Sequence, residues 1–475
     1  MRPIKSVIPA EAGIHSLCGQ LKFLDSGLRR NDEVLPLRSF ARISLILLAV
    51  TLALFSGLAQ AGVQIQHWVA PSGAKVYFVE SRGLPILDVQ IDFVAGSARD
   101  PAEKSGVASL AAGLLESGAG EGAGALDEEQ ISARLVDLGA RLSSSADHDR
   151  ASLMLRTLSS TEEITGALAL LHAVLSAPTF PENALAREKT RTIEALKEAA
   201  TRPDSIAARR FAAAIYPDHP YGRVATPESV ARITRDDLVA FYKTHYTARH
   251  AVVSIIGDVS KDEAAAIAQQ LTATLSAGEA STALPAIKQP QRDTVKVTHP
   301  ATQSHIHIGL PGMSRTDPDY FALLVGNYTL GGGGFVSRLM KEVREKRGYA
   351  YSVYSYFAPR VQAGPFQIGL QTKREQAQDA LQVVDEVLTK FLAEGPTAQE
   401  LAAAKKNLID GQALRIDSNA KLLGYLSLIG FHGLPLDYLD QFPRQVGAIT
   451  RDDVTAAFRR HVKPENLVTV IVAAD

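Results

Sequence analysis

The sequence predicts an α+β protein made of two tandem, homologous units of about 200 residues each. Three observations support this prediction. The chain has 475 residues, of which 46% are hydrophobic, enough to bury a large core. A segment near residue 240 recurs near the C-terminus. Both halves contain strand-like alternating runs and long amphipathic runs that indicate helices. Strands and helices are therefore expected to form separate layers.

The charge balance excludes several classes of protein. The chain carries 50 basic and 51 acidic residues, and its isoelectric point is near 6.9. Such a chain has no field strong enough to attract polyanions. With 21% charged residues it is also unlike a disordered or fibrous protein. Binding to DNA, RNA or acidic lipid is therefore not expected.

The repeat consists of ITRDDLVAFYKTHYTARHAVVSIIGDV from Ile233 and ITRDDVTAAFRRHVKPENLVTVIVAAD from Ile449. The two segments align without a gap, and nine of 27 positions are identical. Thr234 and Thr450 each precede two aspartates, which is a helix-start signature, and an apolar strand closes each segment. Each helix is expected to end near His245 or His461, where a positive charge is favourable.

The first half contains alternating runs that predict strands and periodic runs that predict helices. The strands are Lys75–Val79, Leu87–Val94 and Ala151–Leu158, and the helices are Gly106–Leu115, Glu128–Leu138, Thr161–Ser176 and Asp204–Ile215.

The second half shows the same mixture of patterns. Its predicted strands are Ser304–Leu310, Ala350–Phe357 and Gly364–Thr372, and its helices are Tyr320–Leu330, Ser337–Arg347 and Glu375–Leu392. The Ala-, Ser- and Pro-rich stretch between the halves has no sustained period and is typical of a linker. The predicted division is a leader at 1–61, an N-terminal domain at 62–276, a linker at 277–291 and a C-terminal domain at 292–475.

The leader contains a 16-residue apolar run, Ile43–Leu58. Arg38 and Arg42 precede it, and Ala59-Gln60-Ala61 follows, which is the pattern of a cleaved secretory signal. A membrane anchor is the alternative, but the run is shorter than the roughly 20 residues that span a bilayer. We expect cleavage after Ala61 and export to the periplasm of a Gram-negative cell.

Residues 1–33 precede the signal without a clear period, and we expect translation to start near Val34 to Leu37. The one cysteine, Cys18, falls within the leader. The mature chain then has no thiol, so a disulfide, a cysteine-ligated zinc and a cysteine nucleophile are excluded.

No metal-binding helix is evident among the twelve histidines, since neither H-E-x-x-H nor H-x-x-E-H occurs. His305 and His307 alternate on one predicted strand and form a possible metal pair, although no third ligand is evident. Ordinary strand packing or hydrogen bonding is the alternative for both. We therefore expect no metal in this chain.

A glycine run, Gly331–Gly334, precedes a basic segment that ends in Tyr351. No Gly-Lys-Ser/Thr follows the glycines, so a flexible loop is favoured over a phosphate cradle. On spacing alone, Arg344 is compatible with a surface salt bridge to Glu342 or Glu345, and Tyr351 with a half-buried strand aromatic.

A series of motifs in a fixed order resembles the pitrilysin/insulinase metallopeptidases, including half-size bacterial members and mitochondrial processing peptidase subunits. They are VQIDFVAGSARD, FPENALAREKTRTIEALKEAATRPDSIAARRF, YPDHPYGRVATPESVARIT, VVSIIGDV, HIGLPGMSRTDPDYFALLVGNYTLGGGG and SRLMKEVREKRGYAYSVYS. The resemblance covers residues 62–475. It implies two domains of the mitochondrial-processing-peptidase-like metallohydrolase fold, each a mainly antiparallel sheet with helices packed on it, and a chamber for peptides formed by four such domains.

The chain departs from this family at the zinc motif. Where H-x-x-E-H is expected, it has Ser109, Ala112 and Gly113 in place of the two histidines and the glutamate. Glu194 lies near the expected third ligand, but a lone carboxylate would not hold zinc. Zinc catalysis needs about three protein ligands and a base. The chain is therefore not expected to hydrolyse peptides alone.

The second half keeps the residues with which this family assists catalysis. The resemblance implies that Arg344 and Tyr351 bind the substrate backbone and the oxyanion of the tetrahedral intermediate. It further implies that the glycine-rich loop contacts the substrate. The loop residues are Gly331, Gly332, Gly333 and Gly334.

Three functions compete on this basis. In the favoured one, the chain is the zinc-less subunit of a periplasmic heterodimeric metallopeptidase that degrades peptides, and zinc is held by a homologous partner encoded by a neighbouring gene. The second is a non-catalytic peptide-binding or scaffold protein of the same fold. The third, an autonomous peptidase with unusual ligands such as His305 and His307, would require a stoichiometric metal.

Overall fold

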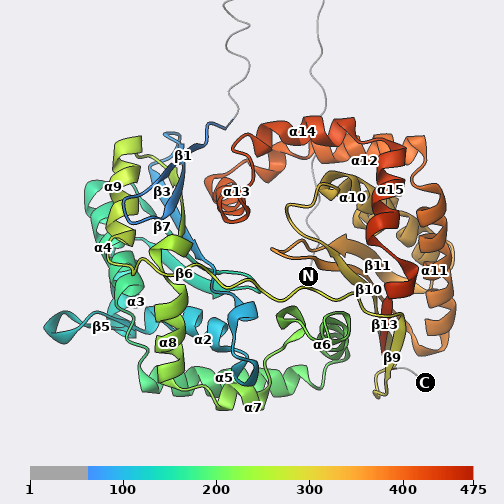
Figure 1. The fold of residues 1–475 in the computed structure, drawn as a ribbon, viewed down its shortest axis with the longest axis horizontal. Coiled ribbons are helices and arrows are strands. Elements are labelled where there is room, and N and C mark those ends of the chain that lie inside the picture. The colour runs from blue at the N-terminus through green and yellow to red at the C-terminus, as the bar shows by residue number, and fades with distance from the viewer. Residues whose placement is uncertain (1–62, 474–475) are drawn as a thin grey trace, which may run out of the picture. The chain divides into compact units, whose positions relative to one another are not determined.

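Two main β-sheets, one in each half of the chain, organise the computed structural model, which describes residues 63–473 (Figure 1). The predicted leader, its cleavage after Ala61 and Cys18 lie outside the described residues. Helices pack against both sheets, so the α+β class is confirmed, with one main sheet in each half of the chain.

The N-terminal sheet has six strands in the order β1-β2-β8-β3-β7-β6. Neighbours pair antiparallel except β2 and β8, which are parallel. The strands are β1 Gln66–Val69, β2 Lys75–Glu80, β3 Ile86–Phe93, β6 Arg141–Ala146, β7 Ala151–Leu158 and β8 Val252–Gly257. A short hairpin, β4 Gly118–Ala119 with β5 Leu126–Asp127, projects from this half (Figure 1).

The C-terminal sheet has five strands in the order β11-β12-β10-β13-β9. Only β13 and β9 pair in parallel. The strands are β9 Asp293–Val297, β10 Gln303–Met313, β11 Ala350–Phe357, β12 Gly364–Lys373 and β13 Val468–Val472. β6 and β11 thus lie at the ends of their sheets, which matters for the cavities described below.

The helices of the N-terminal half are α2 Val107–Gly113, α3 Glu128–Asp137, α4 Thr161–Ser176, α5 Glu182–Ala199, α6 Pro203–Ile215, α7 Pro227–Ala231, α8 Arg235–His245 and α9 Lys261–Thr272. Those of the C-terminal half are α10 Tyr320–Asn327, α11 Ala377–Glu394, α12 Ala398–Asp410, α13 Asn419–His432, α14 Tyr438–Ala448 and α15 Arg451–His461. Two π-helices lie near the glycine run: η7 Tyr328–Gly332 contains its first two glycines, and η9 Met340–Glu345 follows it.

The repeated segments form the same local structure in both halves. Thr234 caps α8 and Thr450 caps α15, each with an aspartate that completes a capping box. Both helices end at the expected histidine. Burial lowers the pKa of His245 to about 4 with help from Arg99, so His245 is neutral near pH 7. The expectation of a favourable positive charge there is wrong, because the desolvation cost outweighs the helix dipole.

Each sheet is covered on one face by a helix from the other half of the chain. Helix α13 packs Leu426 and Ile429 on β2 and β8, while α6 packs Phe211 on the C-terminal sheet (Figure 1). The backbones come close, since a Cβ on Gly430 would lie 2.5 Å from Val252. The side chain of Gln90 also donates to Ser427 Oγ at 2.9 Å. The two halves therefore share buried surface.

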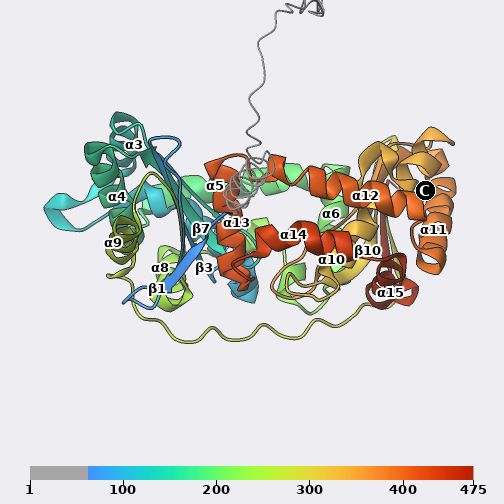
Figure 2. The same cartoon turned by 90° about the horizontal axis from the view of Figure 1, so that it is seen from above.

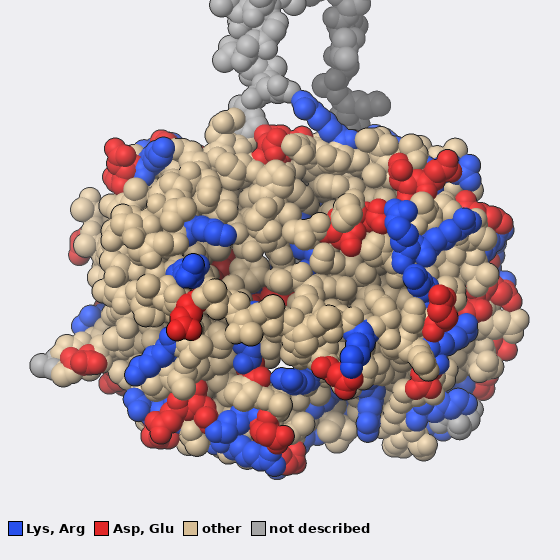
Figure 3. All heavy atoms as spheres, viewed as in Figure 1, with Lys and Arg blue, Asp and Glu red and all other residues tan. Residues whose placement is uncertain are grey.

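Residues 276–292 form no helix or strand and run along the outside of the molecule between the halves (Figure 2). No helix within residues 63–473 is long and apolar enough to cross a membrane. Acidic and basic side chains are intermixed on the face that Figure 3 shows, without a field of one sign. This face therefore offers no concentrated positive field to a polyanion.

Candidate functional site

Arg344 lies on a helix that is anchored at its start. The predicted helix Ser337–Arg347 contains the π-helix η9, a form often found at functional sites. The Arg338 guanidinium donates to Glu400 at 2.8 and 2.7 Å and to the carbonyl of Gly395 at 2.9 Å. The side chains of Arg338 and Glu400 are only 15% and 24% exposed. This ion pair ties η9 to α12.

The Arg344 guanidinium lies between two aromatic rings, 4.9 Å from the centre of Phe335 and 4.7 Å from that of Tyr351. Glu342 is occupied by Lys346 and Arg347, at 2.7 and 2.9 Å. Within the described part of the chain, Arg344 therefore forms no ion pair, and the salt-bridge alternative is wrong. The guanidinium contacts the two rings by cation–π interactions, so its N–H donors remain available to bind a ligand.

Tyr351 is brought to the surface by an irregularity in β11. The pairing with β12 shifts by one residue between Ala350 and Val353, which is a β-bulge. As a result Tyr351 and Ser352 both lie exposed between two buried residues, and Tyr351 is 83% exposed. The half-buried alternative for Tyr351 is therefore wrong. Regular alternation would have placed its ring on the same buried face of the sheet as Val353, but the bulge turns the ring toward solvent.

Close packing explains most of the glycine run. A Cβ on Gly331 would lie 2.4 Å from Ser355, and one on Gly333 would lie 2.6 Å from the carbonyl of Tyr328. Gly334 has a φ of +60°, which favours glycine. The expected flexible loop is wrong, because Gly331 and Gly332 end a π-helix and Gly334 starts a 3-10 helix. The glycines allow these turns to lie close against β11. These packing roles do not test whether the substrate contacts the glycines. Substrate contact therefore stays a prediction for Gly331, Gly332, Gly333 and Gly334.

Arg344 and Tyr351 meet in one cleft of about 680 Å³ beside β11. Among the described residues that line it, Arg344 is the single charged one. Phe335, 64% exposed, forms part of the wall. The lining comprises Met313, Tyr320, Leu324, Asn327, Gly331, Gly332, Gly334, Phe335, Met340, Arg344, Tyr351, Ser352, Val353, Tyr354, Ser355, Tyr356, Phe357 and Pro359. The cleft is thus aromatic and carries one unpaired cation.

The degenerate zinc motif lies on α2. Ser109 and Gly113 are one helical turn apart and line a second cavity, of about 890 Å³, whereas Ala112 is fully buried in the core. The helix start is fixed by Asp100, which accepts hydrogen bonds from the amides of Gly106 and Ala108 at 2.6 and 2.8 Å. Burial raises the pKa of Asp100 to about 6 despite these bonds.

The second cavity is lined with glutamates rather than histidines. Glu116, Glu128 and Glu188 line it together with Arg191, which binds Glu188 at 2.7 Å. Glu194 is exposed and does not line this cavity, so the residue proposed from spacing is replaced by Glu188, about a turn and a half earlier on α5. Arg187 binds Glu128 and Arg191 binds Glu188, while Glu116 accepts a hydrogen bond from Ser144. The three carboxylates form no common ligand set in the described residues, so this lining does not fit zinc, which needs three or four ligands together.

The other candidate metal ligands have ordinary partners. Gln367 donates its side-chain amide to His307 Nδ1 at 2.9 Å, and burial lowers the pKa of His307 to about 4. In residues 63–473 one group of three possible ligands comes together, Asp317, Asp319 and His461, but Asp319 is also engaged by Arg460 at 2.7 Å. The pair His305 and His307 does not belong to that group.

Sequence reasoning missed several residues of these sites. Phe335 and the anchor Arg338 have no periodic signal, because Phe335 lies in a three-residue 3-10 helix and Arg338 precedes a π-helix. Glu188 could have been found from helical periodicity, since it shares a face of α5 with Thr192, which also lines the cavity.

Comparison with known proteins finds two family matches. Residues 77–227 match "Insulinase (Peptidase family M16)", and residues 232–408 match "Peptidase M16 inactive domain". A solved structure of a peptidase M16 inactive domain from Pseudomonas fluorescens has 37% identity and a TM-score of 0.83. It covers 87% of this chain and 98% of its own.

Among curated proteins, the non-peptidase homolog YmxG of Helicobacter pylori is 26% identical over 434 residues, covering 90% of this chain and 98% of that protein. An uncharacterized zinc protease of Streptomyces coelicolor is 30% identical over 261 residues, and the match spans 52% of this chain and 56% of that relative. A protease from Helicobacter pylori with a TM-score of 0.78 and 18% identity shares the fold.

Proposed function

Because this chain belongs to peptidase family M16 but lacks the family's zinc motif, we propose that it is the non-zinc subunit of a periplasmic heterodimeric metallopeptidase. A homologous partner with H-x-x-E-H carries the zinc, and the pair degrades peptides. The observation that carries the proposal is the unpaired Arg344 beside the exposed Tyr351 in an open cleft.

In this proposal the H-x-x-E-H residues of the partner would hold zinc, which would supply polarisation of the attacking water, while this chain holds the substrate. The Arg344 guanidinium has several N–H donors and no competing carboxylate, so it binds carbonyl oxygens of the peptide. The Tyr351 hydroxyl donates to the oxyanion as the tetrahedral intermediate forms. Such donors act strongly because they are preorganised where charge develops. The anchored π-helix and the bulged strand supply that preorganisation.

Export to the periplasm rests on the signal-like leader alone, with its basic flank, apolar run and Ala-x-Ala end. The heterodimer is supported by the contrast between the two sites of this chain. One site retains its substrate-binding pair, whereas the other has lost its histidines. A chain that kept only the assisting half of a catalytic site fits a partner that supplies the rest.

Co-purification tests the proposed partnership. The tagged full chain is isolated from its native cell envelope, and the proteins that accompany it are quantified by mass spectrometry. We expect a relative with H-x-x-E-H in near-equal amount. A chain that elutes alone, or with unrelated proteins, would contradict the heterodimer and favour the non-catalytic peptide-binding or scaffold alternative.

A further inference from the structure

Two tyrosines form a stacked pair on β11, outside the Arg344 and Tyr351 pair. The ring centres of Tyr354 and Tyr356 are 6.0 Å apart, with an angle of 16° between the ring planes. They are two residues apart on a strand and therefore lie on the same face of the sheet. Both rings are partly exposed and line the aromatic cleft. Partly exposed, stacked rings offer a flat apolar surface to a ligand.

Tyr356 is held by a relay that reaches the other half of the chain. Its hydroxyl donates to Gln367 Oε1 at 2.9 Å, and the amide of Gln367 donates to His307 Nδ1 at 2.9 Å. The His307 ring in turn packs edge-on against Phe211 of α6, with centres 5.6 Å apart. The Tyr356 ring is therefore fixed before any ligand binds.

Tyr354 lies over a glycine on the neighbouring strand. A Cβ on Gly369 would be 2.5 Å from Cζ and from the hydroxyl oxygen of Tyr354. The absence of a side chain at Gly369 thus leaves room for the ring to lie against β12 beside Tyr356. Because both rings are positioned in advance, a ligand pays little ordering entropy when it stacks on them.

The charge of the cleft restricts what can bind beside the tyrosines. Arg344 is the only charged side chain among the described lining residues, and no carboxylate opposes it. The cavity at the degenerate motif has the opposite character, with three glutamates and one arginine. Complementary charge therefore favours an acidic ligand in the aromatic cleft and disfavours a basic one.

We propose that Tyr354 and Tyr356 form a subsite for an aromatic side chain of a bound peptide, and that an acidic residue next to that aromatic residue binds Arg344. The inference rests on the proposed function in so far as the ligand is a peptide. It goes further by naming the peptide's composition and two residues beyond Arg344 and Tyr351. A peptide that lies along β11 reaches both places at once.

Fluorescence anisotropy with the purified full chain tests the subsite. The probes are labelled, amidated peptides Gly-Gly-Phe-Asp-Gly-Gly, Gly-Gly-Ala-Asp-Gly-Gly and Gly-Gly-Phe-Lys-Gly-Gly. We expect the first to bind about tenfold more tightly than either of the others, because they lose the stacking or the charge contact. Equal affinity for the phenylalanine and alanine probes would overturn the proposal.

A glycine substitution separates the subsite from the rest of the cleft. Gly369→Ala should displace the Tyr354 ring and weaken binding of the phenylalanine probe by about fivefold to tenfold, while the alanine probe is unaffected. Gly424→Ala on α13 is the control, since its Cβ would meet nothing within 4 Å. If Gly369→Ala does not fold, Tyr354→Ser replaces it, with the same expected selectivity. Equal loss for both probes would contradict the subsite.

These binding measurements need no partner, so they are independent of the hydrolysis tests. A mixture that hydrolyses peptides while this chain does not discriminate between the probes would refute the subsite and leave the heterodimer intact. If the chain binds the phenylalanine probe selectively but no mixture hydrolyses peptides, the subsite is supported and the heterodimer is refuted.

Discussion

Arg344→Ala is expected to slow peptide hydrolysis by the mixture of this chain and the proposed zinc-bearing partner by about 10²–10³ in kcat, with a smaller change in KM. The guanidinium has no intramolecular carboxylate to satisfy, so its removal takes away a preorganised donor without releasing a buried charge. Steady-state kinetics of the reconstituted mixture, with equal amounts of variant and wild-type chain, measures the effect.

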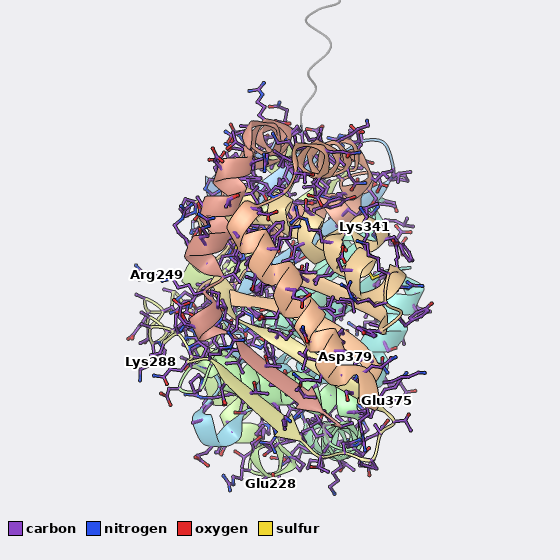
Figure 4. The ribbon with its side chains drawn as sticks, turned by 90° about the vertical axis from the view of Figure 1, so that its right-hand side faces the viewer. Glu228, Arg249, Lys288, Lys341, Glu375 and Asp379 are labelled. Carbon is purple, nitrogen blue, oxygen red and sulfur yellow. The ribbon has the colours of Figure 1, made fainter. Side chains whose placement is uncertain are left out.

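Lys341→Ala is the matched control, because Lys341 is an exposed cation of the same π-helix and does not line the cleft (Figure 4). It should leave the rate unchanged. Arg344→Lys should recover only part of the activity, since an ammonium lacks the planar fork of the guanidinium. If Arg344→Ala and Lys341→Ala behaved alike, Arg344 would have no role in the reaction.

Arg338→Ala is expected to lower the free energy of unfolding by about 1–3 kcal/mol. The substitution leaves the partly buried Glu400 without its cation and leaves the carbonyl of Gly395 without this donor. It also removes the guanidinium that lies 5.2 Å from the centre of the Phe391 ring. Urea denaturation followed by circular dichroism measures the loss, and the mixture should lose activity because η9 carries Arg344.

The contribution of the Arg338–Glu400 ion pair can be recognised by how the free energy of unfolding changes at acidic pH. Burial alone raises the pKa of Glu400, but hydrogen bonds from Arg338 and the Thr397 amide outweigh it and lower the pKa to about 2. The pair's contribution is therefore complete above the unfolded-state pKa, near 4.3, and is lost as the pH falls toward 2. Glu400→Gln should remove this part of the acid dependence. An acid profile that Glu400→Gln leaves unchanged would contradict the assignment.

The repeated segments show what the sequence could predict. Thr234 and Thr450 cap their helices as expected, since a cap depends on residues three positions apart. The strands at Ala151–Leu158 and Ala350–Phe357 match the predicted bounds, because alternation is a local signal. These elements were predictable because they depend on interactions between residues that are close in the sequence.

The packing of α6 and α13 on the sheet of the other half of the chain was not predictable from local patterns. The amphipathic pattern of α6 identifies an apolar face, but it does not say which sheet covers that face. Phe211 therefore reads as an ordinary core residue of the first half, although it packs on the second. The partner of a helix is a tertiary property, and a single sequence carries no direct signal for it.

The candidate site was predicted in part. Arg344 and Tyr351 come together as the family resemblance implies, but the exposure of Tyr351 depends on a bulge that alternation alone does not reveal. In the first half, spacing pointed to Glu194 whereas the cavity contains Glu188. Counting along a helix with an uncertain offset misplaced the side chain here by about a turn and a half, and the packing of α5 against the cavity is needed to correct it.

The most direct test of the heterodimer is the rate of peptide hydrolysis measured for this chain, for its zinc-bearing relative and for their equimolar mixture. We predict little activity from either chain alone and a rate in the mixture well above their sum, abolished by a zinc chelator. A mixture no faster than the zinc-bearing relative alone would contradict the proposal that this chain completes its partner's active site.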